Sequence, residues 1–224
     1  NSSTATIYRH AEDRPMTEST GEIGTGFSVE VAKAWEKALF ADELPSTRRV
    51  ALRSTIVLGH GGVLGPVEKL ARFGLGGSQY DGRWPISAAR RAAGTGHLPG
   101  ARRGRQRFSW VHIEDVARII AFLEQTPSLD GPVNAASPHP VDNAEFMATV
   151  RRVLGVRVGV PMPRWMLELG AIGMRTETEL ILKSRWVLPE KLAAAGFEFR
   201  YPTLEDAIRE SFDRSQVAEA ESVA

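Results

Sequence analysis

Runs of β-branched and apolar residues alternate with segments of helical periodicity as far as residue 137, and this alternation constrains the fold most strongly. The clearest run is RVALRSTIVL at residues 49–58. Such a run is typical of a strand buried on both faces, as in a parallel sheet. Strands that alternate with helices indicate an α/β fold with parallel strands. After residue 137 the pattern is mainly helical.

The predicted elements divide the chain into three parts. We expect strands at residues 4–8, 49–58, 107–111 and 132–136. We expect helices at residues 28–40, 64–75, 113–125, 142–154, 163–172, 176–184, 189–195 and 203–212. Residues 1–137 then form a sheet-containing domain with an irregular loop at 76–106, residues 138–213 a small C-terminal domain, and residues 214–224 a flexible tail.

Composition excludes several kinds of site. The chain has no cysteine, which excludes disulfides, thiolate metal sites and cysteine nucleophiles. The five histidines are scattered and form no H-x-x-x-H pair, so we expect no metal site. No apolar run reaches the ~18 residues of a membrane helix, and we expect no membrane partner. No signal-peptide pattern is visible, so we expect a cytoplasmic protein.

Positive charge is concentrated in one segment, although the net charge is only +1. Residues 82–113 contain no Asp or Glu and hold Arg83, Arg90, Arg91, Arg102, Arg103, Arg105 and Arg107. The segment is a lid over substrate or cofactor phosphates, a nucleic-acid-binding element, or an extended surface loop without a ligand. Nucleic acid is the weakest of these interpretations, because the aromatic residues that could stack on bases lie only at the ends of the segment.

Three groups of polar residues stand where they could carry chemistry. Hydroxyls at residues 2–6 lie near the carboxyl end of a strand, where ligands of doubly wound sheets bind; a plain buried strand is the alternative. Arg53 lies on an apolar strand and needs a partner if it is buried, either a cofactor or an internal carboxylate. His112 and Asp115 stand three residues apart where a strand enters a helix, and could hydrogen-bond each other.

Several segments resemble, in order, the extended short-chain dehydrogenases and sugar-nucleotide epimerases. Residues 2–8 (SSTATIY) resemble their S-S-x-A-x-V-Y-G strand, and residues 51–59 (ALRSTIVLG) their L-R-x-x-x-V-x-G turn. Residues 108–116 (FSWVHIEDV) and 131–136 (GPVNAA) resemble two later motifs of the same superfamily. A narrower resemblance, to the atypical epimerase-family or cell-division-inhibitor-like branch with a C-terminal domain of unknown function, rests on AWE at 34–36, FSWVH at 108–112, LPEKL at 188–192 and GFEFRYP at 196–202.

The resemblance implies a Rossmann-type fold that binds NAD(P), with NADP slightly preferred. The chain would be the second half of a doubly wound parallel sheet plus a mainly helical substrate-side part. The family's first strands and its G-x-x-G-x-x-G phosphate loop do not occur in this sequence, and the Gly-His-Gly-Gly turn at residues 59–62 lacks that spacing. Because the first residue is also Asn rather than Met, we expect a fragment that binds dinucleotide weakly or not at all by itself.

The superfamily's usual Tyr-x-x-x-Lys pair is absent. In such a pair the lysine lowers the pKa of the tyrosine, so that the phenol can exchange a proton. When this helix is aligned with the superfamily at Glu36, the Tyr and Lys positions fall on Ser28 and Ala32. Lys33 is one place off, about 100° around the helix. It is a candidate cofactor ligand or a solvated surface lysine.

The resemblance places Thr4 at the superfamily's catalytic Ser/Thr position and Tyr8 at the end of the same strand. We therefore predict Thr4 and Tyr8 as catalytic residues and Lys33 and Arg53 as cofactor-binding residues. The predicted substrate-binding residues are Arg105, Arg107, Trp110 and His112.

Three function hypotheses remain open. The first is an NAD(P)-dependent oxidoreductase or epimerase that transfers hydride at a carbonyl or alcohol carbon of a small-molecule substrate. The second is an NAD(P)H-binding regulatory protein without turnover. The third and weakest is nucleic-acid binding through the arginine-rich segment. A homo-oligomer is compatible with each of the three.

Overall fold

A three-stranded parallel sheet forms the centre of the fold. The computed structural model describes the chain except residues 81, 83–84, 86–87, 89–103, 168–183 and 224, and for residues 215–223 it describes the backbone alone. The strands are β1 (Ser2–Thr4), β2 (Val50–Ser54) and β6 (Gly131–Ala135), with β2 in the middle. Both neighbouring pairs are parallel, which confirms the predicted α/β class.

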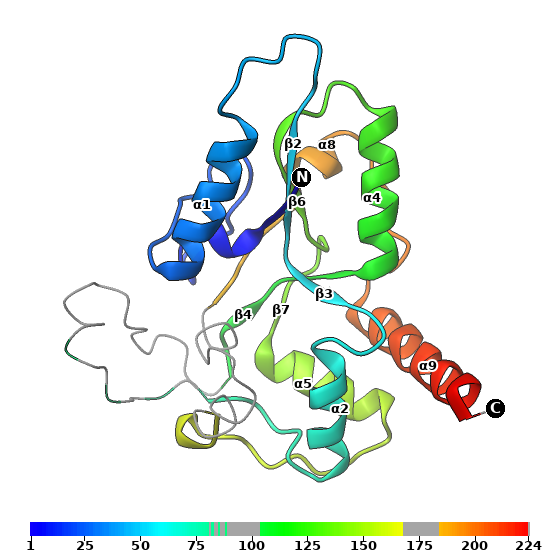
Figure 1. Ribbon diagram of the computed structural model, residues 1–224. Coiled ribbons are helices and arrows are strands. Elements are labelled where there is room, and N and C mark those ends of the chain that lie inside the picture. Colours follow the sequence, from blue (N-terminus) through cyan, green and yellow to red (C-terminus); the bar gives the residue numbers. More distant parts are fainter. Residues whose placement is uncertain (81, 83–84, 86–87, 89–103, 168–183, 224) are drawn as a thin grey trace.

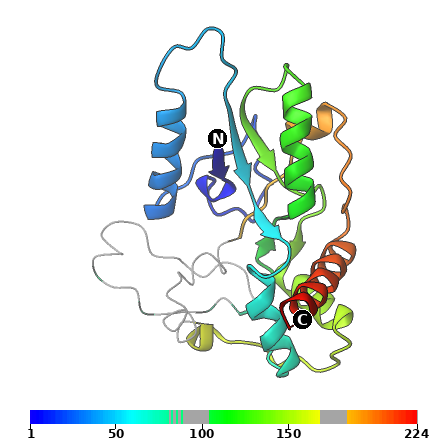
Figure 2. The ribbon, with the colours of Figure 1, turned by 45° about the vertical axis from the view of Figure 1, so that its right-hand side comes forward.

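Two helices cover the opposite faces of this sheet. Helix α1 (Phe27–Leu39) and helix α4 (Ile113–Gln125) stand on either side of β2 and β6 (Figure 1; Figure 2 shows the same arrangement after a turn). Ile119 and Leu123 of α4 pack against Leu52 and Val133 of the sheet. The observed bounds of α4 agree with the prediction at both ends.

Helix α1 has the predicted position but an unexpected orientation. The apolar pattern that predicted this helix includes Trp35, yet Trp35 is 50% exposed. The residues that α1 buries are Val29, Ala32 and Glu36. A carboxylate therefore faces the sheet where an apolar side chain would be expected.

The predicted strand at residues 49–58 is two strands, because the chain changes neighbours at Thr55. The Thr55 amide and hydroxyl both donate to the carbonyl of Ala135 at 3.0 Å. Strand β3 (Ile56–Leu58) then pairs in parallel with β5 (Trp110–His112). The predicted strand at residues 107–111 also divides, since β4 (Arg107–Phe108) pairs antiparallel with β7 (Val141–Asp142).

The predicted strand at residues 4–8 is wrong beyond Thr4. The Thr4 hydroxyl accepts a hydrogen bond from the Thr6 amide at 3.1 Å. This cap turns the backbone into a short 3₁₀ helix, η1 (Ala5–Ile7).

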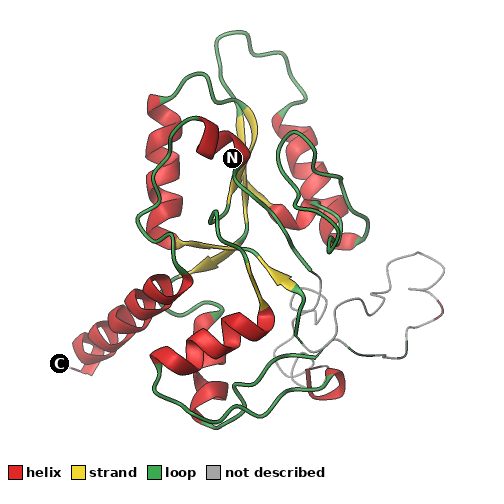
Figure 3. Cartoon of the chain, turned by 180° about the vertical axis from the view of Figure 1, so that it is seen from behind, coloured by secondary structure: helices red, strands yellow, loops and turns green. Residues whose placement is uncertain are grey.

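A second core lies below the sheet. Helices α2 (Leu64–Arg72), α5 (Asn143–Val153) and α9 (Leu204–Val223) gather there, and the short helix α8 (Glu190–Ala194) packs on β6 (Figure 3 shows these elements from behind). The residues buried in this core include Trp110, Met147 and Ile208. Helix α9 continues to Val223, since no Gly or Pro interrupts it and ion pairs at four-residue spacing support it; the flexibility predicted from residue 214 stays a prediction.

Several predictions fall outside the described residues. One is the irregular loop at 76–106, of which most residues and five arginines are not described. The others are the predicted helices at 163–172 and 176–184, of which the structure describes a helical turn at 164–167. The division into two domains stays a prediction. Within the described part of the chain, no helix is long and apolar enough to cross a membrane.

Candidate functional site

A row of three polar residues crosses the parallel sheet. Ser3 of β1 pairs in register with Arg53 of β2, and Arg53 pairs with Asn134 of β6. Residues in register on parallel strands project from the same face of a sheet. All three are buried, with exposures of 6%, 7% and 0%. The sheet therefore presents a guanidinium to α1, flanked by a hydroxyl and an amide.

Glu36 of α1 neutralises that guanidinium. Arg53 Nε donates to Glu36 Oε1 at 2.8 Å and Arg53 Nη2 to Oε2 at 2.7 Å, while Ser3 Oγ donates to Oε1 at 2.7 Å. Burial raises the pKa of Glu36, but the hydrogen bonds from Arg53 and Ser3 and the charge of Arg53 together outweigh it, and the pKa lies below its usual value. Of the two partners expected for Arg53, the structure contains the internal carboxylate.

Tyr8 is held between Arg53 and Asn134. Arg53 Nη1 donates to the phenol oxygen at 2.8 Å, and the phenol donates to Asn134 Oδ1 at 2.9 Å. The side chain is only 1% exposed. Burial raises the pKa of Tyr8 above its usual value, against the opposing effects of Arg53 and Asn134. A neutral, enclosed phenol of this kind fixes the backbone after β1.

The Thr4 side chain lies at the carboxyl end of β1 and is half-buried. Its hydroxyl donates to Thr6 Oγ1 at 3.0 Å and accepts from the Thr6 amide. Among the described residues the Thr6 hydroxyl has no acceptor for its own proton. The two threonines thus form a short hydroxyl relay where ligands of parallel sheets bind.

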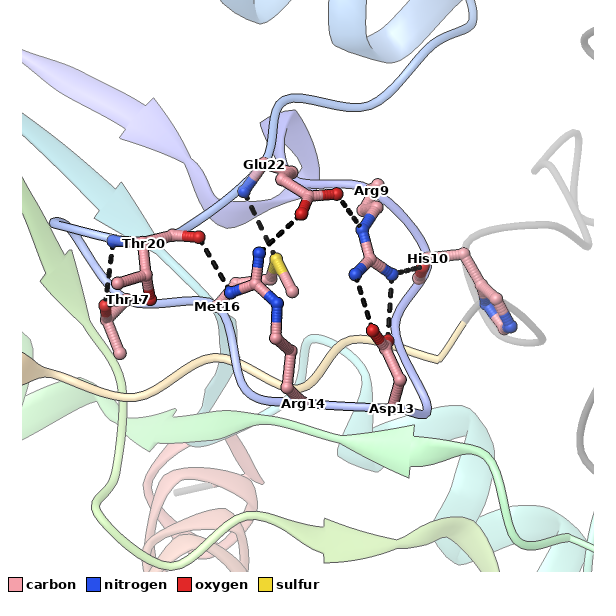
Figure 4. Close-up of polar contacts among 8 residues, drawn as sticks. All are labelled: Arg9, His10, Asp13, Arg14, Met16, Thr17, Thr20 and Glu22. Atoms are coloured by element: carbon pink, nitrogen blue, oxygen red, sulfur yellow. Dashed lines mark hydrogen bonds and ion pairs between the residues drawn. The ribbon is translucent and has the colours of Figure 1, made fainter.

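The loop at residues 9–24, between η1 and α1, is fixed by surface ion pairs. Arg9 makes two hydrogen bonds to the Asp13 carboxylate, at 2.9 and 2.8 Å, and one to Glu22 at 2.5 Å, as Figure 4 shows. Arg14 bonds to the other Glu22 oxygen and to the carbonyl of Thr20. The hydrogen bonds from Arg9 hold the pKa of Asp13 well below its usual range.

Glu18 connects this loop to β6, the edge strand opposite β1. Its carboxylate accepts from the backbone N–H of Asn134 at 2.8 Å and from the backbone N–H of Glu190, at the start of α8, at 3.0 Å. Burial raises the pKa of Glu18, although the amide hydrogen bonds oppose it. One polar chain therefore runs from α8 through β6, Tyr8 and β2 to α1.

A cleft of about 830 Å³ opens beside α1. Lys33, Lys37 and Arg53 line it against two carboxylates, Glu30 and Glu36. Lys33 is exposed and forms an ion pair with Glu30 at 3.0 Å. Thr4 is not among the lining residues, so the cleft and the hydroxyl relay lie at different places.

The four predicted substrate-binding residues have different surroundings, and their role stays a prediction. Arg105 is exposed, and the Arg107 guanidinium stacks over Trp186, 4.6 Å from the ring centroid. Trp110 is buried and donates to the carbonyl of His139 at 3.1 Å. His112 is buried as well. No cluster of three potential metal ligands occurs among the described residues.

His112 joins α4 to α9. Its Nδ1 accepts from the Glu114 amide at 3.3 Å and so caps α4, while Nε2 lies 2.9 Å from Glu210 Oε2. Burial lowers the pKa of His112, although Glu210 opposes it. Asp115, the partner suggested by sequence, instead accepts from the amides of Arg200 and Tyr201.

Parallel strands with helices on both faces and hydroxyls at a carboxyl edge define a Rossmann-like α/β protein. Comparison with known proteins identifies the relatives. The chain is 30% identical over 204 residues to the epimerase family protein YfhF of Bacillus subtilis. It is 34% identical over 187 residues to the human epimerase family protein SDR39U1. Residues 162–211 match the model of a domain of unknown function, DUF1731. The predicted resemblance to the epimerase family with a C-terminal domain of unknown function is thus confirmed.

Solved structures agree on the fold. The crystal structure of human SDR39U1 isoform 2 with NADPH superposes with a TM-score of 0.76 at 27% identity, over 95% of this chain and 64% of that one. The Thermus thermophilus UDP-glucose 4-epimerase in complex with NAD superposes at 0.65 and 18% identity, over 97% of this chain and 63% of that one, which speaks for the fold alone.

The alignments cover most of this chain but a smaller share of each relative. They include 90% and 82% of this chain but 58% and 54% of the Bacillus and human relatives. The chain thus spans less than two thirds of the length of the proteins that it resembles. What the whole relatives do is therefore a matter of proposal for this chain.

Proposed function

We propose that this chain supplies the second half of the sheet and the substrate-side part of an NAD(P)-dependent oxidoreductase or epimerase that acts by hydride transfer at a carbonyl or alcohol carbon. The observation that carries the proposal is the Thr4–Thr6 hydroxyl relay at the carboxyl end of β1. It stands in a chain whose relatives include a protein crystallised with NADPH.

Thr4 and Thr6 orient the reacting oxygen in this proposal. Thr4 donates to Thr6, which leaves the Thr6 proton available for the oxygen of a carbonyl substrate. Tyr8, predicted as a second catalytic residue, then acts by holding η1 in place, because its hydroxyl is enclosed by Arg53 and Asn134. The proton that balances the hydride comes through the threonine hydroxyls or from water.

The cleft beside α1 has the chemistry to hold the phosphates of a dinucleotide. Its three cations outnumber its two carboxylates, and Lys33 and Lys37 are exposed. Lys33 and Lys37 would bind phosphate oxygens, and the nicotinamide would give or take the hydride. Arg53 contributes by position, because Glu36 and Tyr8 occupy its guanidinium.

NADPH titration of the 224-residue chain, followed by NMR, tests the cofactor part. We expect weak binding, with a dissociation constant on the order of 1 mM, shifts at Thr4 and Thr6, and loss of affinity for Lys33→Ala and at high salt. Glu43→Ala, a change at an exposed position outside the cleft, is the control. A spectrum that NADPH leaves unchanged contradicts the proposal.

A regulatory protein that binds NAD(P)H without turnover is the second candidate. It is favoured by Ser28 and Ala32 at the positions of the usual Tyr and Lys, and by the enclosure of Tyr8. Oxidation of NADPH by a panel of aldehydes and ketones separates the candidates. Turnover that Thr4→Ala abolishes and Ser2→Ala retains supports the enzyme, whereas binding without turnover supports the regulator.

Three finer predictions belong to the same proposal: a preference for NADP over NAD, a cytoplasmic location and a small-molecule substrate. Competition between NADPH and NADH in the titration tests the first. Nucleic-acid binding would depend mainly on arginines outside the described residues.

A further inference from the structure

Arg107, the first residue of β4, differs from most arginines of this fold. Arg53 binds the Glu36 carboxylate, and Arg48 binds backbone carbonyls at the end of α4. The Arg107 side chain is half-buried, but within the described ranges no carboxylate or carbonyl accepts from its guanidinium. A partly desolvated cation without an acceptor is unfavourable. The fold therefore holds a positive charge that a ligand can neutralise.

The guanidinium of Arg107 is held in place from both sides. Its backbone N–H donates to Ser184 Oγ at 2.6 Å, and its carbonyl accepts from the Arg185 N–H at 2.9 Å. The guanidinium stacks over Trp186, whose own carbonyl accepts from the Met16 N–H at 2.6 Å. Stacking uses the face of the guanidinium and leaves the N–H groups at its edge for a ligand. A cation fixed in this way loses little conformational freedom on binding.

Arg107 lies at the ligand-binding edge of the parallel sheet. Figure 1 shows β4 beyond the carboxyl ends of β2 and β6. Ile56, just after β2, donates its N–H to the carbonyl of Ser109 at 3.3 Å, two residues after Arg107. On the other side, the N–H of Ser184 donates to Nδ1 of His10, in the segment that follows η1, at 2.9 Å. Arg107 and the hydroxyl relay after β1 therefore belong to the same edge.

We propose that the Arg107 guanidinium binds a carboxylate of the substrate, so that the substrate is an oxo acid or a hydroxy acid. The role of the bound acid as substrate rests on the proposed function. A guanidinium donates two parallel N–H bonds to the two oxygens of a carboxylate. One positive charge without a partner also matches the single negative charge of a carboxylate, whereas a phosphate dianion would keep a net charge. The hydroxyl relay then takes the oxygen at the reacting carbon of the same molecule.

Titration of the 224-residue chain with levulinate, a small oxo acid, tests the carboxylate site in the absence of cofactor. The backbone amide signals of Arg107 and Arg185 report binding by NMR. We expect a dissociation constant on the order of 10 mM, and no shifts with levulinamide, its neutral counterpart. Arg107→Gln should weaken levulinate binding at least about tenfold. Trp186→Leu keeps the charge but removes the stack, and should weaken binding about threefold.

Arg157→Gln is the matched control, because it removes the same charge at an exposed position outside β4 and should leave the affinity unchanged. Thermal unfolding confirms that each variant is folded. Equal shifts with levulinamide, an affinity that Arg107→Gln leaves unchanged, or inorganic phosphate that binds more tightly than levulinate would overturn the proposal.

The titration needs neither cofactor nor turnover, so its failure is distinct from a failure of the proposed function. Levulinate binding in a chain that does not bind NADPH would confirm the carboxylate site and overturn its role in substrate binding. Where turnover occurs, Arg107→Gln should raise the KM for levulinate at least about tenfold and leave the KM for methyl levulinate unchanged. Equal changes for the acid and its ester would overturn the assignment of Arg107 to the carboxylate.

Discussion

Helices α1 and α4 have 13 residues each, cover the two faces of one sheet, and each bury one carboxylate and two apolar residues, yet only the carboxylate of α1 pairs with a charged side chain of the sheet. Helix α4 places Ile119 and Leu123 on an apolar face. Helix α1 places Glu36 on Arg53 and leaves Trp35 half-exposed. The difference teaches that helical periodicity identifies the apolar side of a helix, whereas the partner surface decides which side is buried. A buried guanidinium requires a carboxylate, and that requirement outweighs the apolar pattern.

The two helices also begin differently. His112 caps α4 through the amide of Glu114, while Gly26 offers α1 no side-chain cap. Apolar contacts attach both helices, those of α1 through Val29 and Ala32, and a buried ion pair is added in α1 and a titratable cap in α4.

The largest effect should come from Glu36→Ala. It leaves Arg53 buried without its counter-ion, and we expect a loss of about 3–5 kcal/mol of unfolding free energy. Urea denaturation measures it. Glu30→Ala removes an exposed carboxylate from the same helix and should cost less than about 1 kcal/mol. Equal effects of the two changes would mean that the buried pair contributes no more than the surface pair.

On the α4 face, Ile119→Ala should cost about 2–5 kcal/mol, because it opens a cavity under a fully buried side chain. Trp35→Ala removes more atoms from α1 and should change stability by less than about 0.5 kcal/mol, because the side chain is half-exposed. Thermal and urea unfolding of both variants tests the contrast. A larger cost for Trp35→Ala would reverse our assignment of the buried faces.

Tyr8→Phe should cost about 1–3 kcal/mol, since it leaves Arg53 Nη1 and Asn134 Oδ1 without their common partner. Tyr201→Phe is the control, because the Tyr201 hydroxyl has no hydrogen-bond partner in the described part of the chain. Should both variants be as stable as the wild type, the polar chain across the sheet would not stabilise the fold.

The smallest effect is the pH dependence of the α4 cap. The pKa of folded His112 lies below its ordinary value of about 6.5, so the unfolded chain binds a proton that the folded chain resists. Stability from this group is complete above pH ~6.5 and declines as the pH falls through that value. The facing charges of Glu210, Asp115 and Arg214 modulate the decline.

His112→Asn keeps an acceptor for the Glu114 amide and removes the titration. Its unfolding free energy should fall less than that of the wild type between pH 7 and 5. Parallel pH profiles for the two proteins would contradict the assignment of this decline to His112.

Sequence predicted the elements better than their contacts. The apolar pattern of α4 predicted its bounds, although Ile120 of that pattern is 55% exposed and Asp115 is buried. The strand at residues 49–58 was predicted as one element because β-branched residues continue through Thr55. The change of neighbour at Thr55 depends on Ala135 and Ser109, which no local pattern reveals.

The site was predicted in part. The need of Arg53 for a partner is visible in an apolar strand, and Glu36 stands within the AWE motif that supported the family resemblance. Asn134, Glu18 and Glu210 were missed, because their roles arise from contacts across 98 to 172 positions of the chain. Only the register of the parallel strands brings Ser3, Arg53 and Asn134 into one row.

The Glu36–Arg53 pair also limits how this protein can change by mutation. Loss of either charge alone leaves the other stranded in the interior, so a lineage that changes one position passes through a poorly folded intermediate. Simultaneous replacement of both residues by apolar ones avoids that intermediate. Positions 36 and 53 should therefore be inherited as a unit, and in a library of random variants that still fold, substitutions at the two positions should occur together.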